Sequence, residues 1–278
     1  MRQDESADMS NSNTGADQQD RKGTFREIAR GCYAFCVEGG SNTGVVVGER
    51  GVLVVDAQPT AALSEQVLEE IAKVTDKPVK HLVMTHFHVD SGLGAGTFEA
   101  GEIVSSELTK RMIQDRGEAD RATALTRFSE IFAGGGRLPV SPKPTMSFAS
   151  SMSIDLGGKE VRLMHLGRGH TVGDVVVWVP DAGVVFAGDL VAVDTAAYCG
   201  DAHLTDWPKA LDRINAFRPE VLLPGRGRPM KSADQASSAI AATKAYVELL
   251  RDTAAACIED GKGLRGTFKA VKAALDAD

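Results

Sequence analysis

Residues 79–90 read VKHLVMTHFHVD, a predicted strand that is followed at once by two histidines and an aspartate. We expect the strand over Val79–Met84, because a short apolar run of this kind is typical of a buried strand. His86 and His88 are two residues apart, so their side chains fall on the same side of an extended segment and can hold one cation. Asp90 adds a carboxylate to the two imidazoles.

Three later segments repeat this arrangement, with polar side chains placed directly after a predicted strand. They carry His170 after the strand expected at 161–166, Asp189 after that at 184–187, and Arg226 after that at 221–223. Because strand ends at one edge of a sheet lie close together, we expect these side chains to converge on one pocket. Imidazole and carboxylate together suit Zn²⁺, Fe or Mn²⁺.

The order of predicted elements favours a layered α/β fold. Three strands, a helix, a strand and one or two helices are followed by four strands, a helix, a strand and a long helix. Two halves that each mix strands and helices are typical of two packed sheets with helices outside them.

Four motifs, in this order, resemble those of the metallo-β-lactamase-fold hydrolase superfamily: THFHVD at 85–90, GHTVGD at 169–174, FAGD at 186–189 and PGRG at 224–227. The resemblance runs from Gly31 to Pro229. It implies a four-layer αββα sandwich with a metal site at the mouth between the sheets. It also implies that His86, His88 and His170 hold a first metal ion. Asp189 would then be shared with, or face, a second metal, and Asp90 would bind that metal or act on the attacking water.

Two positions depart from the motifs of that superfamily. Residue 91 is Ser where H-x-H-x-D-H continues with His, and residue 226 is Arg where P-G-H-G is common. The histidines for a second metal are therefore absent. A guanidinium stays protonated and repels cations, so we expect Arg226 to occupy the second place as a fixed charge, with Asp90 as its bidentate partner. The prediction is one Zn²⁺ per chain, with Fe or Mn as alternatives.

The function that the resemblance implies is metal-dependent hydrolysis of a small carbonyl substrate, namely an ester, lactone, amide or thioester. Asp90 would orient or deprotonate the water, and Arg226 would stabilise the oxyanion or hold a substrate carboxylate. Two alternatives stay open: a mononuclear iron enzyme that oxidises a thiol or persulfide, and a non-catalytic protein of the same fold. His203 is a further candidate for a metal ligand or a substrate contact. Ser91 is expected to cap a helix or to fill space.

The composition argues against nucleic-acid and membrane partners, so the expected partner is a small-molecule substrate. The chain has 31 Lys+Arg against 38 Asp+Glu and a formal net charge of −7, which argues against a nucleic-acid partner. No uncharged apolar run reaches the roughly 18–20 residues needed to cross a bilayer, so no membrane partner is expected. The first residues contain no apolar stretch typical of a signal peptide, and we expect a cytoplasmic protein.

The chain is expected to divide into three parts. Residues 1–23 have few apolar side chains and are predicted to form a disordered tail, because they cannot offset their ordering entropy by burial. Residues 24–255 are assigned to the metallo-β-lactamase-like domain, and residues 256–278 to a C-terminal helical extension. Within the domain, the Gly- and Pro-rich segment 134–144 is a candidate flap, and the Ala-rich helix expected at 231–255 is a candidate homodimer contact.

Overall fold

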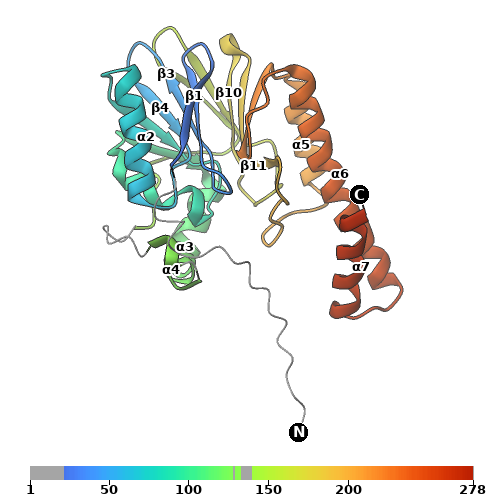
Figure 1. Ribbon diagram of the computed structural model, residues 1–278. Helices are drawn as coiled ribbons and strands as arrows, with labels where there is room; N and C mark the ends of the chain where they lie inside the picture. Colours follow the sequence, from blue (N-terminus) through green and yellow to red (C-terminus); the bar gives the residue numbers. More distant parts are fainter. Residues whose placement is uncertain (1–21, 128, 133–139, 278) are drawn as a thin grey trace.

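The computed structural model describes residues 22–127, 129–132 and 140–277 (Figure 1). Most of the predicted N-terminal tail and residues 134–139 of the predicted flap lie outside these residues.

Seven strands form the first sheet, in the order β1-β2-β3-β4-β5-β6-β7. Their bounds are Thr24–Ala29 (β1), Cys32–Cys36 (β2), Thr43–Val47 (β3), Val52–Val55 (β4), Val79–Val83 (β5), Glu102–Ser106 (β6) and Met146–Phe148 (β7). The strands from β1 to β4 are antiparallel neighbours, and those from β4 to β7 are parallel. The carboxyl end of β5 therefore lies in the middle of a parallel region, where loops can form a site.

Five strands form the second sheet, in the order β12-β11-β10-β9-β8. Their bounds are Ser151–Asp155 (β8), Glu160–Met164 (β9), Val176–Val179 (β10), Val184–Ala192 (β11) and Val221–Arg226 (β12). In this sheet β11 and β12 are parallel, and the other neighbouring strands are antiparallel. Both strands run past the ends expected from the sequence, so Asp189 and Arg226 lie inside strands rather than in the loops after them.

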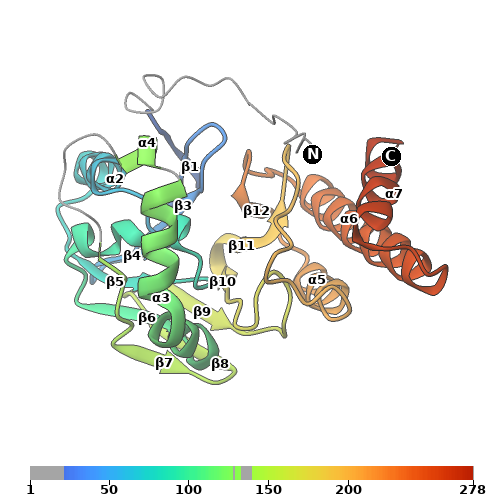
Figure 2. The same ribbon diagram turned by 90° about the horizontal axis from the view of Figure 1, so that it is seen from below.

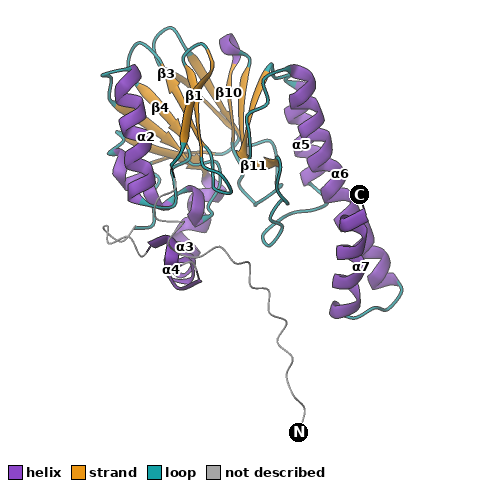
Figure 3. Cartoon of the chain, in the orientation of Figure 1, coloured by secondary structure: helices purple, strands orange, loops and turns teal. Residues whose placement is uncertain are grey.

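Helices cover the outer faces of the two sheets, which pack against each other through a shared apolar core (Figure 3). On the side of the first sheet lie α2 (Ala61–Val74), α3 (Glu107–Arg127) and α4 (Ser129–Phe132), and on the side of the second lie α5 (Trp207–Ala216) and α6 (Ala233–Glu259). The described residues also form 3₁₀ helices at Val89–Ser91 (η1), Leu93–Phe98 (η2) and Pro180–Ala182 (η3). The predicted αββα sandwich is confirmed.

Local sequence explains how α2 begins and which face it buries. Its N-cap is Thr60, whose hydroxyl accepts a hydrogen bond from the Leu63 amide. Val67 and Ile71, one turn apart, are buried against the first sheet. This packing fixes the helix beside β4 and β5, the strands that lead into the site.

The C-terminal part of the chain is helical. Helix α6 continues to Glu259, past the domain boundary expected at residue 255, and α7 (Leu264–Ala277) follows after a short turn. Within the described ranges, no helix is both long enough and apolar enough to span a membrane.

Candidate metal centre

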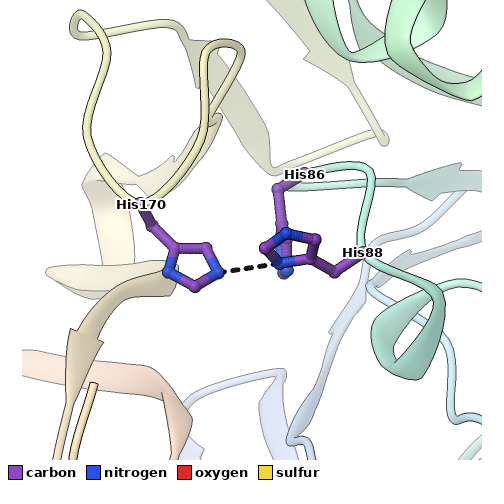
Figure 4. A group of neighbouring side chains, drawn as sticks. All are labelled: His86, His88 and His170. Atoms are coloured by element: carbon purple, nitrogen blue, oxygen red, sulfur yellow. Dashed lines mark hydrogen bonds between the residues drawn. The ribbon is translucent and has the colours of Figure 1, made fainter. Parts of the chain in front are cut away.

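Three histidines meet where strands of both sheets end. His86 and His88 follow β5, and His170 lies between β9 and β10. Figure 4 shows the three rings facing one another, and one ligand nitrogen from each lies within 4.8 Å of the other two. Nδ1 of His88 is 2.9 Å from Nε2 of His170. The structure thus brings together the three histidines expected to bind one ion.

The orientation of His86 is set by a buried hydrogen-bond chain. Thr85 donates its hydroxyl and its amide to the carboxylate of Asp56, at 2.7 and 2.8 Å. Because the hydroxyl proton of Thr85 is donated to Asp56, Oγ1 of Thr85 accepts a hydrogen bond from Nδ1–H of His86, 2.9 Å away. Nε2 of His86 then carries a lone pair, and it is buried without a hydrogen-bond partner among the described residues.

The orientation of His88 is set by a carboxylate from the loop after β11. Nε2 of His88 lies 3.0 Å from Oδ2 of Asp201, so it donates there and leaves the lone pair on Nδ1. Arg116 of α3 donates to Oδ1 of Asp201 at 2.8 Å and to Asp120 at 2.7 Å. Its guanidinium also lies over the Phe87 ring, 5.0 Å from the centroid. Helix α3 therefore braces the carboxylate that holds His88.

Burial keeps all three imidazoles neutral. It lowers the pKa of His88 to about 4 and that of His170 to about 4. It also moves the pKa of His86 well below its usual value, and the neighbouring histidines add to this effect. The ring nitrogens of three neutral imidazoles converge here, and Nε2 of His86 is buried without a hydrogen-bond partner among the described residues. This is the donor set of a transition-metal ion. The residues present fit a bound metal.

Asp189, at the inner edge of the cluster, adds a buried carboxylate. Its Oδ2 lies 3.6 Å from Nε2 of His170 and 3.9 Å from Nε2 of His86. Burial raises the pKa of Asp189 to about 7. The approach of β12 to this carboxylate requires glycine, because a Cβ on Gly225 would lie 2.0 Å from Oδ1 of Asp189.

Arg226 occupies the space between two carboxylates. Its Nη2 donates to Oδ2 of Asp90, and its Nε faces Oδ2 of Asp189 at 3.4 Å. The expected ion pair with Asp90 is present, but the expected bidentate geometry is wrong. The guanidinium spans two carboxylates, because β12 carries Arg226 alongside β11 and so beside Asp189.

Two other residues singled out by the sequence are not among the three converging histidines. Ser91 is buried in η1, and its backbone carbonyl accepts from Ala57. His203 is tied through its backbone amide to Gly169, and its side chain does not belong to the three-histidine group.

Sequence reasoning missed Asp56, Arg116 and Asp201. The signal for Asp56 was present, since it directly follows the apolar run at 51–55, much as Asp189 follows the apolar run at 184–187. Asp201 lies 113 residues from His88 in a loop without periodic pattern, so no local spacing connects the two.

Replacing Asp201 by Asn is expected to weaken metal binding by about 10–100-fold, the usual cost of losing an outer carboxylate on a ligating histidine. The amide keeps the size of the side chain but lacks the charge that favours His88 as a donor. Metal titration against a chromophoric chelator measures the effect. Asp206→Asn is a matched control in the same loop, because Asp206 pairs with Arg168 at the surface. Equal affinities of Asp201→Asn and the wild type would rule out this role.

Comparison with known proteins agrees with this geometry. Residues 36–226, more than half of the chain, match the model of the metallo-beta-lactamase superfamily, and the chain belongs to that superfamily. It is similar to the linear primary-alkylsulfatase of a Pseudomonas species, with 22% identity over 240 residues. That match covers 75% of this chain but only 45% of the alkylsulfatase.

Metallo-beta-lactamases are also among the relatives. The type 2 enzyme of Bacteroides fragilis is 25% identical over 194 residues, which cover 67% of this chain and 69% of that protein. Among solved structures, the metallo-beta-lactamase from Pontibacter korlensis has a TM-score of 0.65 and 22% identity, over 82% of this chain and 99% of that one. These relatives support a metal-dependent hydrolase at a general level.

Proposed function

We propose that this chain hydrolyses a small carbonyl substrate with one metal ion and a water molecule. The observation that carries the proposal is the combination of three converging neutral imidazoles with an arginine beside Asp90 and Asp189. The three histidines would bind one metal ion, and the guanidinium of Arg226 would supply the positive charge that a second ion would otherwise bring.

His86, His88 and His170 would hold the ion, with Asp189 beside them. A bound Zn²⁺ would supply Lewis-acid chemistry, polarising a substrate oxygen and lowering the pKa of water toward ~7.

Asp90 is the residue proposed to handle the proton of the attacking water. Its side chain is 38% exposed, so water and substrate can reach it, whereas Asp189 is nearly enclosed. The ion pair with Arg226 fixes the direction of the carboxylate, and a positioned carboxylate within reach of the water serves as a general base.

Arg226 is proposed to stabilise negative charge that develops on the substrate. It is 28% exposed, and its charge is held in place by two carboxylates before the reaction begins. A preorganised cation beside a developing oxyanion lowers the barrier because no reorganisation is needed during the reaction.

A panel of chromogenic substrates tests the proposal. The full chain, loaded with Zn²⁺, is assayed with an aryl acetate, a thioester, a lactone, a β-lactam and an aryl sulfate, with His88→Ala as the background. Turnover of at least one carbonyl compound above that background is the expected result.

Three outcomes would contradict the proposal. The first is turnover of the sulfate ester alone, which is the class of bond named for the alkylsulfatase relative. The second is oxygen uptake with a thiol by the iron-loaded chain, without hydrolysis. The third is no turnover of any carbonyl compound, which would favour a non-catalytic protein.

A further inference from the structure

Two helices at the C-terminus lie outside the part of the chain that matches the family. The family match ends at residue 226, and α6 and α7 follow it. The first half of α6 packs on the second sheet and α5, through residues such as Ala236, Ile240 and Val247. Its second half and α7 form a hairpin that stands away from the sandwich (Figures 1 and 2).

The turn of this hairpin exposes large apolar side chains. Ile258 is 70% exposed, Leu264 is 88% exposed and Phe268 is 64% exposed. The other exposed large apolar residues in the described part of the chain are less exposed, at 37–58%, and lie at scattered places: Val74, Val140, Met146 and Tyr198. Three large apolar side chains exposed close to one turn of the chain favour an interaction site on this part of the surface.

The apolar face of α7 has a packed part and an exposed part. Thr267, Ala270 and Ala274 are half-buried, and α6 is the main packing partner of α7. A row of larger residues with 4-3-4 spacing lies beside them: Leu264 and Phe268 are exposed, whereas Val271 and Leu275 are half-buried like the three small residues. The exposed end of this row, Leu264 and Phe268, lies next to the hairpin turn, and helix α7 has no fully buried residue.

Charges of opposite sign border the row of larger residues on the two helices. Arg265, Lys269 and Lys272 run along α7, one position after residues of this row, and Asp252 and Glu259 lie seven residues apart on α6. Lys272 and Asp252 also pair within their own helices, with Asp276 and Arg251. The hairpin face therefore carries an acidic edge, an apolar centre and a basic edge.

We propose that this face binds the same face of a second copy of the chain. A two-fold axis along the hairpin places the acidic edge of α6 in one copy over the basic edge of α7 in the other, twice by symmetry, and buries the apolar centre between them. The pattern is self-complementary, which is the requirement of an isologous dimer. This inference is independent of the proposed catalytic function.

The mass of the full chain in solution tests the dimer. Light scattering after gel filtration is expected to give twice the chain mass of 29.4 kDa. Leu264→Glu and Phe268→Glu are each expected to give the mass of one chain, while Val74→Glu, at an exposed apolar residue far from the hairpin, leaves the dimer intact. Thermal melting checks that each variant folds. A monomeric wild type at tens of micromolar would overturn the proposal.

Charge reversal tests the pairing of the helices. Arg265→Glu/Lys269→Glu/Lys272→Glu makes both edges acidic, and Asp252→Lys/Glu259→Lys makes both edges basic, so each variant alone is expected to be monomeric. Mixed together, they are expected to form a heterodimer, because every contact across the axis is then between opposite charges. Failure of the mixture to associate, with each variant folded, would contradict this arrangement.

Discussion

His88→Ala is expected to lose tight metal binding and, with it, hydrolytic activity. The substitution removes one of three converging nitrogens. It also removes the ring nitrogen that donates to Oδ2 of Asp201. The loss of affinity should exceed the about 10–100-fold that removal of an outer hydrogen-bond partner costs. A chelator-competition titration measures affinity, and the substrate panel measures turnover.

His203→Ala is the matched control for this variant, since it removes an imidazole from the neighbouring loop but not from the cluster. It is expected to bind metal as the wild type does. If His88→Ala kept wild-type affinity, or if His203→Ala lost it, the ligand set would be wrong.

Arg226→Gln is expected to lower kcat/KM by about 10²–10³-fold, the range found when one preorganised group at an oxyanion is removed. The variant should still bind one metal ion, because no histidine is changed. Its defect arises because Asp90 and Asp189 lose the cation between them and the substrate loses a fixed positive charge. Steady-state kinetics and metal analysis of the same preparation separate these effects.

Arg226→Lys keeps the positive charge but replaces the planar guanidinium by a single ammonium group. The lysine side chain therefore cannot contact both carboxylates as the guanidinium does. We expect its kcat/KM to lie between those of the wild type and Arg226→Gln. A wild-type kcat/KM in Arg226→Gln would show that the arginine has no role in catalysis.

Much of this fold and site could be predicted from short stretches of sequence. The apolar runs of β4 and β5 and the spacing of His86 and His88 are local signals, and they correctly indicated a layered fold with polar residues at the strand ends. The αββα arrangement came from the order of four motifs. Local patterns suffice for β4, which is buried along its whole length and so has a distinctive composition, whereas only the last two residues of β5 are buried.

Other features depend on contacts between distant parts of the chain. Strand β7 has three residues and is recognisable only by its pairing with β6. The two-carboxylate position of Arg226 depends on the register of β11 with β12, which shifts between Gly188 and Ala192. The Arg116–Asp201 contact joins α3 to a loop 85 residues away. Neither periodicity nor motif spacing encodes such contacts.

The metal content of the purified chain tests the central claim most directly. Elemental analysis after saturation with Zn²⁺ and removal of loosely bound ions is expected to give one equivalent per chain. Ser91→His/Arg226→His, which restores both absent imidazoles, is expected to give two. Two tightly held equivalents in the wild type would contradict the account, because Arg226 would then not take the place of a second ion.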